Sequence, residues 1–362
     1  MKIKKGKNKG ELSELYTLIR LLADGKVYTV KEDLIPVENC FLQILEISRH
    51  EEPNHRLEYK VVRNPTNEDH SVALYINDNF VTQISSTELN ILAKKFYESL
   101  IVGNGIIVGE QIMKKLNCTK VKAPSSDKTD ITLQVHDPFT NLNTICGYSI
   151  KSDIGSPPTL LNASHATNFI FEVLELSAEQ IIAINSIKTK SKILDRIQAI
   201  KRYGKLKFLN VANKTFAQNL LFIDTQMELF LAVMLETCYT TGIKNCARLI
   251  TFLEQQDPFN LQTENLYRHK LKKFLCAVAL GLSPAKLWNG LEEANGGYII
   301  VKRTGAVVAY HLHDRNSFEN YLLNNTYFET PSTSRHELGK IYLKGNRYFI
   351  NLNLQIRFKN PS

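Results

Sequence analysis

The feature that most constrains the fold of this chain is a strand–turn–strand pattern between residues 130 and 150. Apolar and polar residues alternate over 130–135, the turn-forming run DPFTN follows at 137–141, and a second strand-like stretch covers 145–150. Alternation with a period of two is typical of a half-buried strand, whereas Asp-Pro and Asn favour turns. The sequence therefore predicts a β-hairpin here.

The two ends of this hairpin carry residues suited to phosphodiester hydrolysis. Asp130 begins the first strand and Lys151 ends the second, so antiparallel pairing places them side by side at one edge. A PD-(D/E)xK nuclease site needs this pairing, because carboxylates hold Mg²⁺ and a lysine positions the attacking water. Ser149 shares a face with Lys151 but stands where the usual second acid would be. A second carboxylate must therefore come from elsewhere.

An amphipathic helix is predicted over residues 11–23, where apolar side chains recur at helical spacing before the stop signal Asp24-Gly25. Its start, KGELSE at residues 9–14, resembles the K-G-x-x-x-E start of the first helix in nucleases of the PD-(D/E)xK fold. In those enzymes the glutamate completes the metal site. The resemblance makes Glu14 the expected second metal ligand beside Asp130, and three other acids remain alternatives: Glu11, Asp137 and Glu172.

The remaining patterns divide the 362 residues into three parts. Residues 1–180 are expected to form the catalytic core, with a peripheral strand-containing insert at about 31–80, a helix over 86–100 and a strand over 168–174. Helical periodicity dominates 181–290, and 291–362 is rich in predicted strands. The expected fold class is α/β: a PD-(D/E)xK nuclease core of mixed sheet flanked by helices, with a helical segment and a β-rich C-terminal part.

The charge balance and the cysteine content limit the class of binding partner and the cellular compartment. The chain has 45 Lys and Arg against 36 Asp and Glu, a net charge of +9, which suits a polyanionic partner. Basic residues gather in the first ten positions and over 188–207, although a solvated helix face explains the second run equally well. Six scattered cysteines and the absence of a signal peptide or membrane-spanning run lead us to expect reduced thiols and a cytoplasmic protein.

Sequence blocks at both ends and in the middle of the chain resemble the HpaII family of type II restriction endonucleases. They are NKGELSELY at 8–16, SSDKTDI at 125–131, GYSIKS at 147–152, TLLNAS at 159–164, ANGGYIIV at 294–301, NYLLNNT at 320–326, ETPSTSRH at 329–336 and LNLQIRF at 352–358. The resemblance implies a Mg²⁺-dependent endonuclease that cuts both strands of duplex DNA at a short palindrome, CCGG in the family's namesake. It further implies a homodimer at least on DNA, and a cognate DNA methyltransferase that protects the same site without direct contact.

A G·C-only target favours arginine as the reader of guanine. Arg335, followed by His336 in a polar segment, is the expected base reader, although the same arginine could instead hold a phosphate. Lys128 is expected to contact a phosphate. Four further residues complete the predicted DNA-binding set: Asn162, Ser164, Asn168 and Arg357.

Other functions remain open at the level of sequence. A non-catalytic DNA-binding module would keep the basic surface, and a structure-directed nuclease such as a junction resolvase would share the first-helix glutamate. His311 and His313 lie on one strand face, but no later histidine completes a ββα-metal nuclease site. The cysteines have no zinc-ligand spacing.

Overall fold

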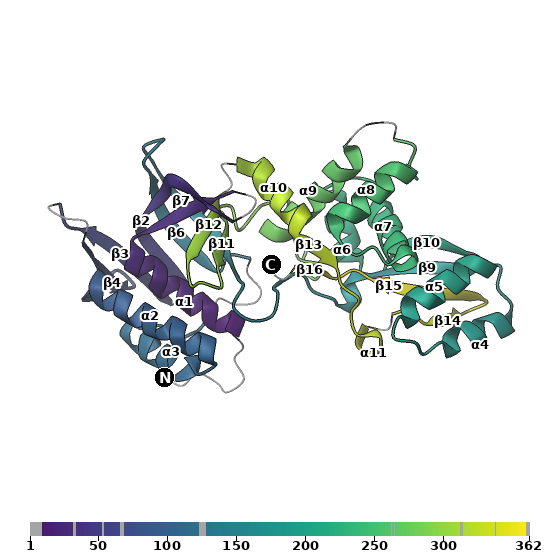
Figure 1. Cartoon of the computed structure of the whole chain (residues 1–362), viewed down its shortest axis with the longest axis horizontal. Helices are drawn as coiled ribbons and strands as arrows, with labels where there is room; N and C mark the ends of the chain where they lie inside the picture. Colours follow the sequence, from purple (N-terminus) through teal and green to yellow (C-terminus); the bar gives the residue numbers. More distant parts are fainter. Residues whose placement is uncertain are drawn as a thin grey trace. The chain divides into compact units, whose positions relative to one another are not determined.

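A computed structural model of the chain describes residues 9–31, 34–52, 54–65, 69–122, 128–261, 263, 265–311, 314–336 and 338–359. The chain divides into two compact units (Figure 1). Among the described residues, the first unit comprises those up to Pro158 together with Glu293–Phe318, and the second comprises Thr159–Glu292 and Glu319–Lys359. The chain thus leaves the first unit after Pro158 and returns to it at Glu293.

A nine-stranded mixed sheet organises the first unit, in the order β1-β12-β11-β7-β6-β2-β3-β4-β5. Because β1 pairs with both β12 and β2, six of these strands close into a ring. The strands are β1 (Lys26–Val30), β2 (Pro36–Glu52), β3 (His55–Arg63), β4 (His70–Ile76), β5 (Asn79–Ser85), β6 (Ile131–Asp137), β7 (Leu142–Ser152), β11 (Gly297–Val301) and β12 (Val307–His311).

Three helices accompany this sheet: α1 (Lys9–Asp24), α2 (Ser86–Val102) and α3 (Gly105–Lys115). α1 and α2 pack against strands, and α3 packs against α1 and α2. Alternate strand residues face them, so that Leu15 and Ile19 of α1 share a core with Leu133 and Tyr148, all fully buried. The Ser85 side chain accepts from the Glu88 N–H and caps the start of α2. Helix α1 is buried over most of its circumference, and this burial fixes it against the hairpin strands.

The second unit combines two small sheets with helices. One sheet has the order β10-β9-β15-β14 and the other β13-β16-β8. The strands are β8 (Thr159–Leu161), β9 (Asn168–Leu174), β10 (Lys205–Val211), β13 (Thr326–Phe328), β14 (Ile341–Lys344), β15 (Arg347–Asn353) and β16 (Ile356–Phe358). The helices are α4 (Ala178–Ser186), α5 (Lys192–Tyr203), α6 (Lys214–Leu221), α7 (Met227–Thr241), α8 (Cys246–Gln256), α9 (Leu266–Leu280) and α11 (Thr333–His336), with the short 3₁₀-helix η1 (His165–Thr167). Helix α10 (Arg315–Asn325) begins in the first unit and ends in the second.

The mixed α/β class, the helices over 11–23 and 86–100, and the hairpin at 130–150 are confirmed. The three-part division differs from the two units. Within the expected peripheral insert at 31–80, β2 pairs with β6 inside the ring and is therefore central, whereas β3 and β4 continue the sheet outside the ring. β10 interrupts the helical stretch. β11 and β12 belong to the first unit because β11 pairs in parallel with β7, a pairing that no local pattern signals.

Candidate active site

The hairpin brings together the three residues that the sequence pattern selected. Ile131 lies opposite Tyr148 in the β6–β7 ladder, and the N–H of Asp130 continues it by donating to the Tyr148 carbonyl at 2.9 Å. Asp130 Oδ2 accepts from Ser149 Oγ at 3.0 Å and from the Ile150 N–H at 2.6 Å. Lys151 Nζ in turn donates to Ser149 Oγ at 2.8 Å.

Ser149 therefore stands between an acid and a base. Its side chain is buried at 4% exposure, and its hydroxyl donates to the Asp130 carboxylate while accepting from the Lys151 ammonium. A neutral hydroxyl can serve both partners at once, whereas a carboxylate can only accept. The residue at the position of the usual second acid thus links the other two.

Strand β11 supplies a wall of the site that the sequence did not reveal. β11 runs parallel to β7, with Tyr298 opposite Ser149 in register. The Lys151 Nζ lies 4.9 Å from the centroid of the buried Tyr298 ring. An aromatic face at this distance attracts the ammonium group and helps to fix its direction. Lys151 is therefore positioned by both Ser149 and Tyr298.

The segment that precedes β11 binds the start of the hairpin. The Lys128 N–H donates to Glu293 Oε2 at 3.1 Å, and Thr129 Oγ1 donates to the Glu293 carbonyl at 2.8 Å. A Cβ at Gly147 would lie 2.6 Å from Thr129 Oγ1 and 2.7 Å from the Glu293 carbonyl oxygen, so this close approach requires glycine. Glu293 is thus an acid at the site that sequence reasoning missed, and no local motif marks it.

A cavity of about 580 Å³ opens beside Asp130. Its lining carries charges of both signs: Arg49, Glu51, Arg56, Lys122, Asp130 and Glu293. Asp130 is partly exposed, so its carboxylate is accessible from this cavity. The cavity therefore joins the carboxylate to basic groups able to meet a phosphate.

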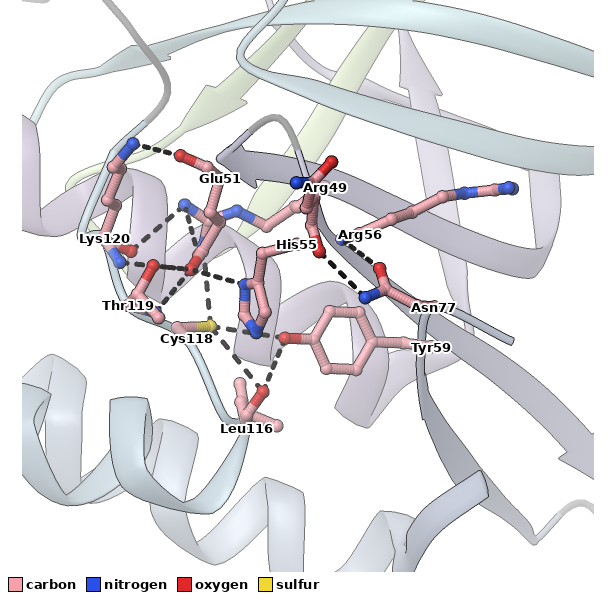
Figure 2. Close-up of polar contacts among 11 residues, drawn as sticks. Arg49, Glu51, His55, Arg56, Tyr59, Asn77, Leu116, Cys118, Thr119 and Lys120 are labelled. Atoms are coloured by element: carbon pink, nitrogen blue, oxygen red, sulfur yellow. Dashed lines mark hydrogen bonds and ion pairs between the residues drawn. The ribbon is translucent and has the colours of Figure 1, made fainter. Parts of the chain in front are cut away.

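A buried polar network holds one side of this cavity in place (Figure 2). Glu51 Oε2 accepts from the N–H groups of Thr119 and Lys120, and Arg49 Nη2 donates to the Lys120 carbonyl at 3.2 Å. Tyr59 donates its hydroxyl to the Leu116 carbonyl at 2.7 Å. These contacts tie the segment after α3 to β2 and β3, and that segment leads to Lys122 in the cavity wall.

The four candidates for the second acid occupy different places. Glu14 of α1 and Asp130 both interact electrostatically with Lys122, which also forms an ion pair with Glu11 at 2.8 Å. Asp137 lies at the opposite end of β6, where it accepts from the Phe139 N–H and the Thr140 hydroxyl in the hairpin turn. Glu172 belongs to the second unit and pairs with Arg347 at 3.5 Å. Glu14 and Glu11 thus share the basic neighbour Lys122 with Asp130, whereas Asp137 and Glu172 are engaged in the hairpin turn and with Arg347.

Lys128 lies at the same edge as Asp130. Burial lowers its pKa to about 8, with the nearby Lys151 acting in the same direction and the acids Glu293 and Asp130 opposing the shift. With this pKa, Lys128 is protonated in most of the molecules near neutral pH. Lys128 therefore adds positive charge beside the Asp130 carboxylate.

Three of the predicted DNA-binding residues meet in the second unit. Asn353 Nδ2 donates to the Ser164 carbonyl and to Asn168 Oδ1, both at 2.7 Å, and Asn168 Nδ2 donates to the His336 carbonyl at 3.1 Å. Asn168 is only 3% exposed, and both polar atoms of its side chain are used within the protein. The structure thus gives Asn168 an internal role, in place of the expected DNA contact. It joins the loop after β8 to α11.

The remaining predicted DNA-binding side chains differ in exposure. Arg335 in α11 and Asn162 after β8 are exposed, whereas Arg357 of β16 is half-buried beside Tyr327. The rings of His165 and His336 meet edge to face with their centroids 6.3 Å apart. Burial, followed by the charges of Arg335 and His165, lowers the pKa of His336.

The remaining expectations concern His313, metal-binding clusters, disulfides and membrane-spanning helices. His313 lies outside the described residues. Within the described ranges no three His, Cys, Asp or Glu side chains cluster closely enough to hold a metal ion, and no disulfide joins the six cysteines. None of the helices in the described part of the chain is long and apolar enough to cross a membrane.

Comparison with known proteins gives one consistent result. The family model described as HpaII restriction endonuclease matches residues 8–358. The chain is 39% identical over 358 residues to the type II restriction enzyme HpaII of Haemophilus parainfluenzae, covering 97% of this chain and 98% of that protein. No solved structure matches the chain.

Proposed function

This chain belongs to the HpaII family and is a type II restriction endonuclease, a site-specific deoxyribonuclease; from that premise we propose that it cuts both strands of duplex DNA at CCGG with bound Mg²⁺. The observation that carries the catalytic assignment is the hydrogen-bonded series Lys151–Ser149–Asp130. Family membership also decides against the junction resolvase and the non-catalytic module that the sequence left open.

The fold proposed for the catalytic unit is a PD-(D/E)xK core. Support comes from the first helix, the hairpin with an acid at its start, and the lysine at its end, all within one sheet. The β11–β12 pair extends that sheet on the Lys151 side. Recognition of DNA is assigned to residues of the second unit, which includes α11.

The carboxylates at the site suit Mg²⁺. Among the described residues no three metal-binding side chains cluster. In this proposal the protein supplies two ligands, the carboxylates of Asp130 and Glu14, which share Lys122 as a neighbour. Mg²⁺ characteristically takes one or two carboxylates and leaves its other positions to water and substrate phosphate. When bound, the metal would stabilise charge on the phosphate and lower the pKa of a bound water.

Each protein group then has a distinct task in hydrolysis. Asp130 holds the metal, while the bonds from Ser149 Oγ and the Ile150 N–H keep its carboxylate oriented. Lys151 directs its ammonium at the attacking water or a phosphate oxygen, supported by Ser149 and the Tyr298 ring. Lys128 neutralises phosphate charge at the same edge.

Sequence reading is proposed to lie with the polar groups around α11. Exposed Arg335 reads guanine through two hydrogen bonds, and His336 contacts DNA beside it. Asn162 and Ser164 approach the backbone or base edges from the neighbouring loop, with Arg357 as a further contact. Asn168 holds this loop to α11 through its bond with the His336 carbonyl.

A palindromic target presents the same bases twice, related by a two-fold axis. Two catalytic sites must therefore act on one target, and we propose a homodimer at least on DNA. A cognate methyltransferase would protect the host by modifying the same site without contacting this protein. Both activities belong to the compartment that holds the host DNA, which is the cytoplasm in a bacterial cell.

Digestion of a defined unmethylated duplex with Mg²⁺ tests the proposed target. Mapping of the fragment ends should place every cut at CCGG, and the same DNA with methylated CCGG should stay intact. Cuts at another palindrome would retain the enzyme class and overturn the target. Fragmentation without a common sequence would overturn both.

A further inference from the structure

A cavity of about 410 Å³ in the second unit is unused by the proposed recognition surface. Three segments line it: the start of α5, the end of α7 with the residues that follow, and the segment leading into α11. The cavity is many times the roughly 30 Å³ share of one water molecule, so it has room for a phosphate group.

The charge of this cavity has one sign. Lys190, Lys192 and Lys244 line it, and none of the described lining residues is acidic. Among the ion pairs of the described residues, none includes these three lysines. The N-terminal end of α5 also faces this region and adds to the positive potential of the lysines.

Two other lysines of the same basic run have acidic partners. Lys201 forms an ion pair with Glu236 at 2.6 Å, and Lys205 forms one with Glu175 at 2.7 Å. Within the run at 188–207, Lys201 and Lys205 thus have acidic partners, whereas Lys190 and Lys192 line the cavity. Among the described residues of the cavity lining none is acidic, so an external anion can meet the charge of these two lysines.

Polar groups from the recognition segment form the wall facing these lysines. Thr330, Ser332 and Thr333 line the cavity. The Ser332 carbonyl accepts from the His336 N–H at 3.2 Å and the Thr333 carbonyl accepts from the Leu338 N–H at 3.3 Å. The cavity wall and the short helix that carries Arg335 are thus one hydrogen-bonded piece.

We propose that this cavity binds a backbone phosphate of the DNA duplex and thereby fixes α11 against the bases that Arg335 reads. Lys190, Lys192 and Lys244 provide the positive charge, and the Thr333 hydroxyl donates a hydrogen bond to a phosphate oxygen. The inference rests on the proposed function only in that its ligand is duplex DNA. It does not depend on CCGG as the target.

The test compares two double variants that each remove two positive charges. Lys192→Ala/Lys244→Ala leaves Lys190 as the last charged side chain of the cavity lining, and Lys201→Ala/Lys205→Ala, the matched control, removes the ion-paired lysines. Binding to a duplex without CCGG is measured over a series of salt concentrations in the absence of divalent metal. Because the cavity is proposed to hold one phosphate, the cavity variant should lose about one unit of the log–log salt slope.

The control variant should keep the wild-type slope, and both proteins should unfold at the wild-type temperature. Equal loss of slope in the two variants would reduce the effect to net charge and overturn the proposal. An unchanged slope in the cavity variant would overturn it as well. A wrong target sequence would instead appear in the digestion of DNA by the wild-type enzyme, so the two failures are distinguishable.

Lysine acetylation followed by mass spectrometry provides a second readout on the wild-type protein. A noncognate duplex should protect Lys190, Lys192 and Lys244 from the reagent and leave Lys201 and Lys205 as reactive as before. Inorganic phosphate at the same phosphate concentration should protect none of them. Protection by inorganic phosphate alone would mark a small-anion site and would contradict a site built for the DNA backbone.

Discussion

Ser149 and Asp130 face each other at the edge of the β6–β7 hairpin, with Ser149 Oγ donating to Asp130 Oδ2 at 3.0 Å. In the proposed PD-(D/E)xK motif this serine stands where the usual metal-binding acid would be, so the site has one negative charge fewer and one hydrogen bond more than that motif. The same hydroxyl accepts from Lys151 at 2.8 Å. The charge that the acid of the motif would supply must therefore come from a neighbouring carboxylate.

Glu14→Gln should weaken metal binding, because it removes one charge and keeps the shape of the side chain. Loss of a direct carboxylate should cost at least the roughly 10–100-fold in affinity that loss of an outer-shell partner costs. Titration of the protein with Mn²⁺ measures this without reference to cleavage. Glu293→Gln is the comparison, since Glu293 lines the same cavity as Asp130. If Glu293→Gln loses the metal and Glu14→Gln keeps it, the second acid is Glu293.

Ser149→Asp should rescue the Glu14→Gln enzyme in part. The new carboxylate would restore the acid of the usual motif beside Asp130, and Lys151 is close enough to offset its charge. The double variant should therefore require less Mg²⁺ for half-maximal cleavage than Glu14→Gln alone. Additive losses in the double variant would show that positions 14 and 149 do not serve the same metal.

Arg335→Ala should relax specificity more than it weakens binding in general. A bidentate arginine–guanine contact contributes roughly 1–3 kcal/mol of discrimination, whereas a phosphate contact stabilises all sequences about equally. Affinity for the cognate duplex should fall by about one to two orders of magnitude at a fixed salt concentration, with little change for a noncognate duplex. An equal fall on both would make Arg335 a backbone contact.

The affinity for DNA should depend on pH through His336. Burial, with Arg335 and His165 nearby, lowers the pKa of this histidine below its ordinary 6.5 in the free protein. A nearby phosphate favours the charged imidazolium and raises that pKa, so binding takes up a proton as the pH falls. Wild-type affinity should therefore rise between about pH 7.5 and about pH 5.5 more steeply than that of His336→Gln. Parallel pH profiles would remove His336 from the interface.

The parts of the molecule that could be predicted from sequence are those encoded by local patterns. Helix α1 and the β6–β7 hairpin have strong periodicity and turn residues, and the hairpin alone brings Asp130 to Ser149 and Lys151. These contacts need only antiparallel pairing across a short turn. They follow from residues within about twenty positions of one another.

Long-range pairing explains what sequence reasoning missed. Tyr298 and Glu293 reach the site because β11 pairs in parallel with β7, about 150 residues away along the chain, and parallel register has no local signal. Asn168 lies near a Ser/Asn-rich loop and is expected from the sequence to contact DNA. In the structure it begins β9, and its side-chain amide donates to the His336 carbonyl and accepts from Asn353. Burial decides whether such an asparagine contacts DNA or bonds within the protein, and burial of a single residue cannot be read from one sequence.

The most direct test of the account is cleavage and binding by Asp130→Ala and Lys151→Ala, measured on the same CCGG duplex. Both residues are proposed to act on the metal and the water, so each variant should cut the duplex at least about 10³-fold more slowly than the wild type. When binding is measured in the absence of metal, each variant should bind the duplex with the affinity of the wild type. Thermal unfolding confirms that each variant is folded. Normal cleavage by either folded variant, or loss of binding in proportion to cleavage, would contradict the assignment of this hairpin as the catalytic site.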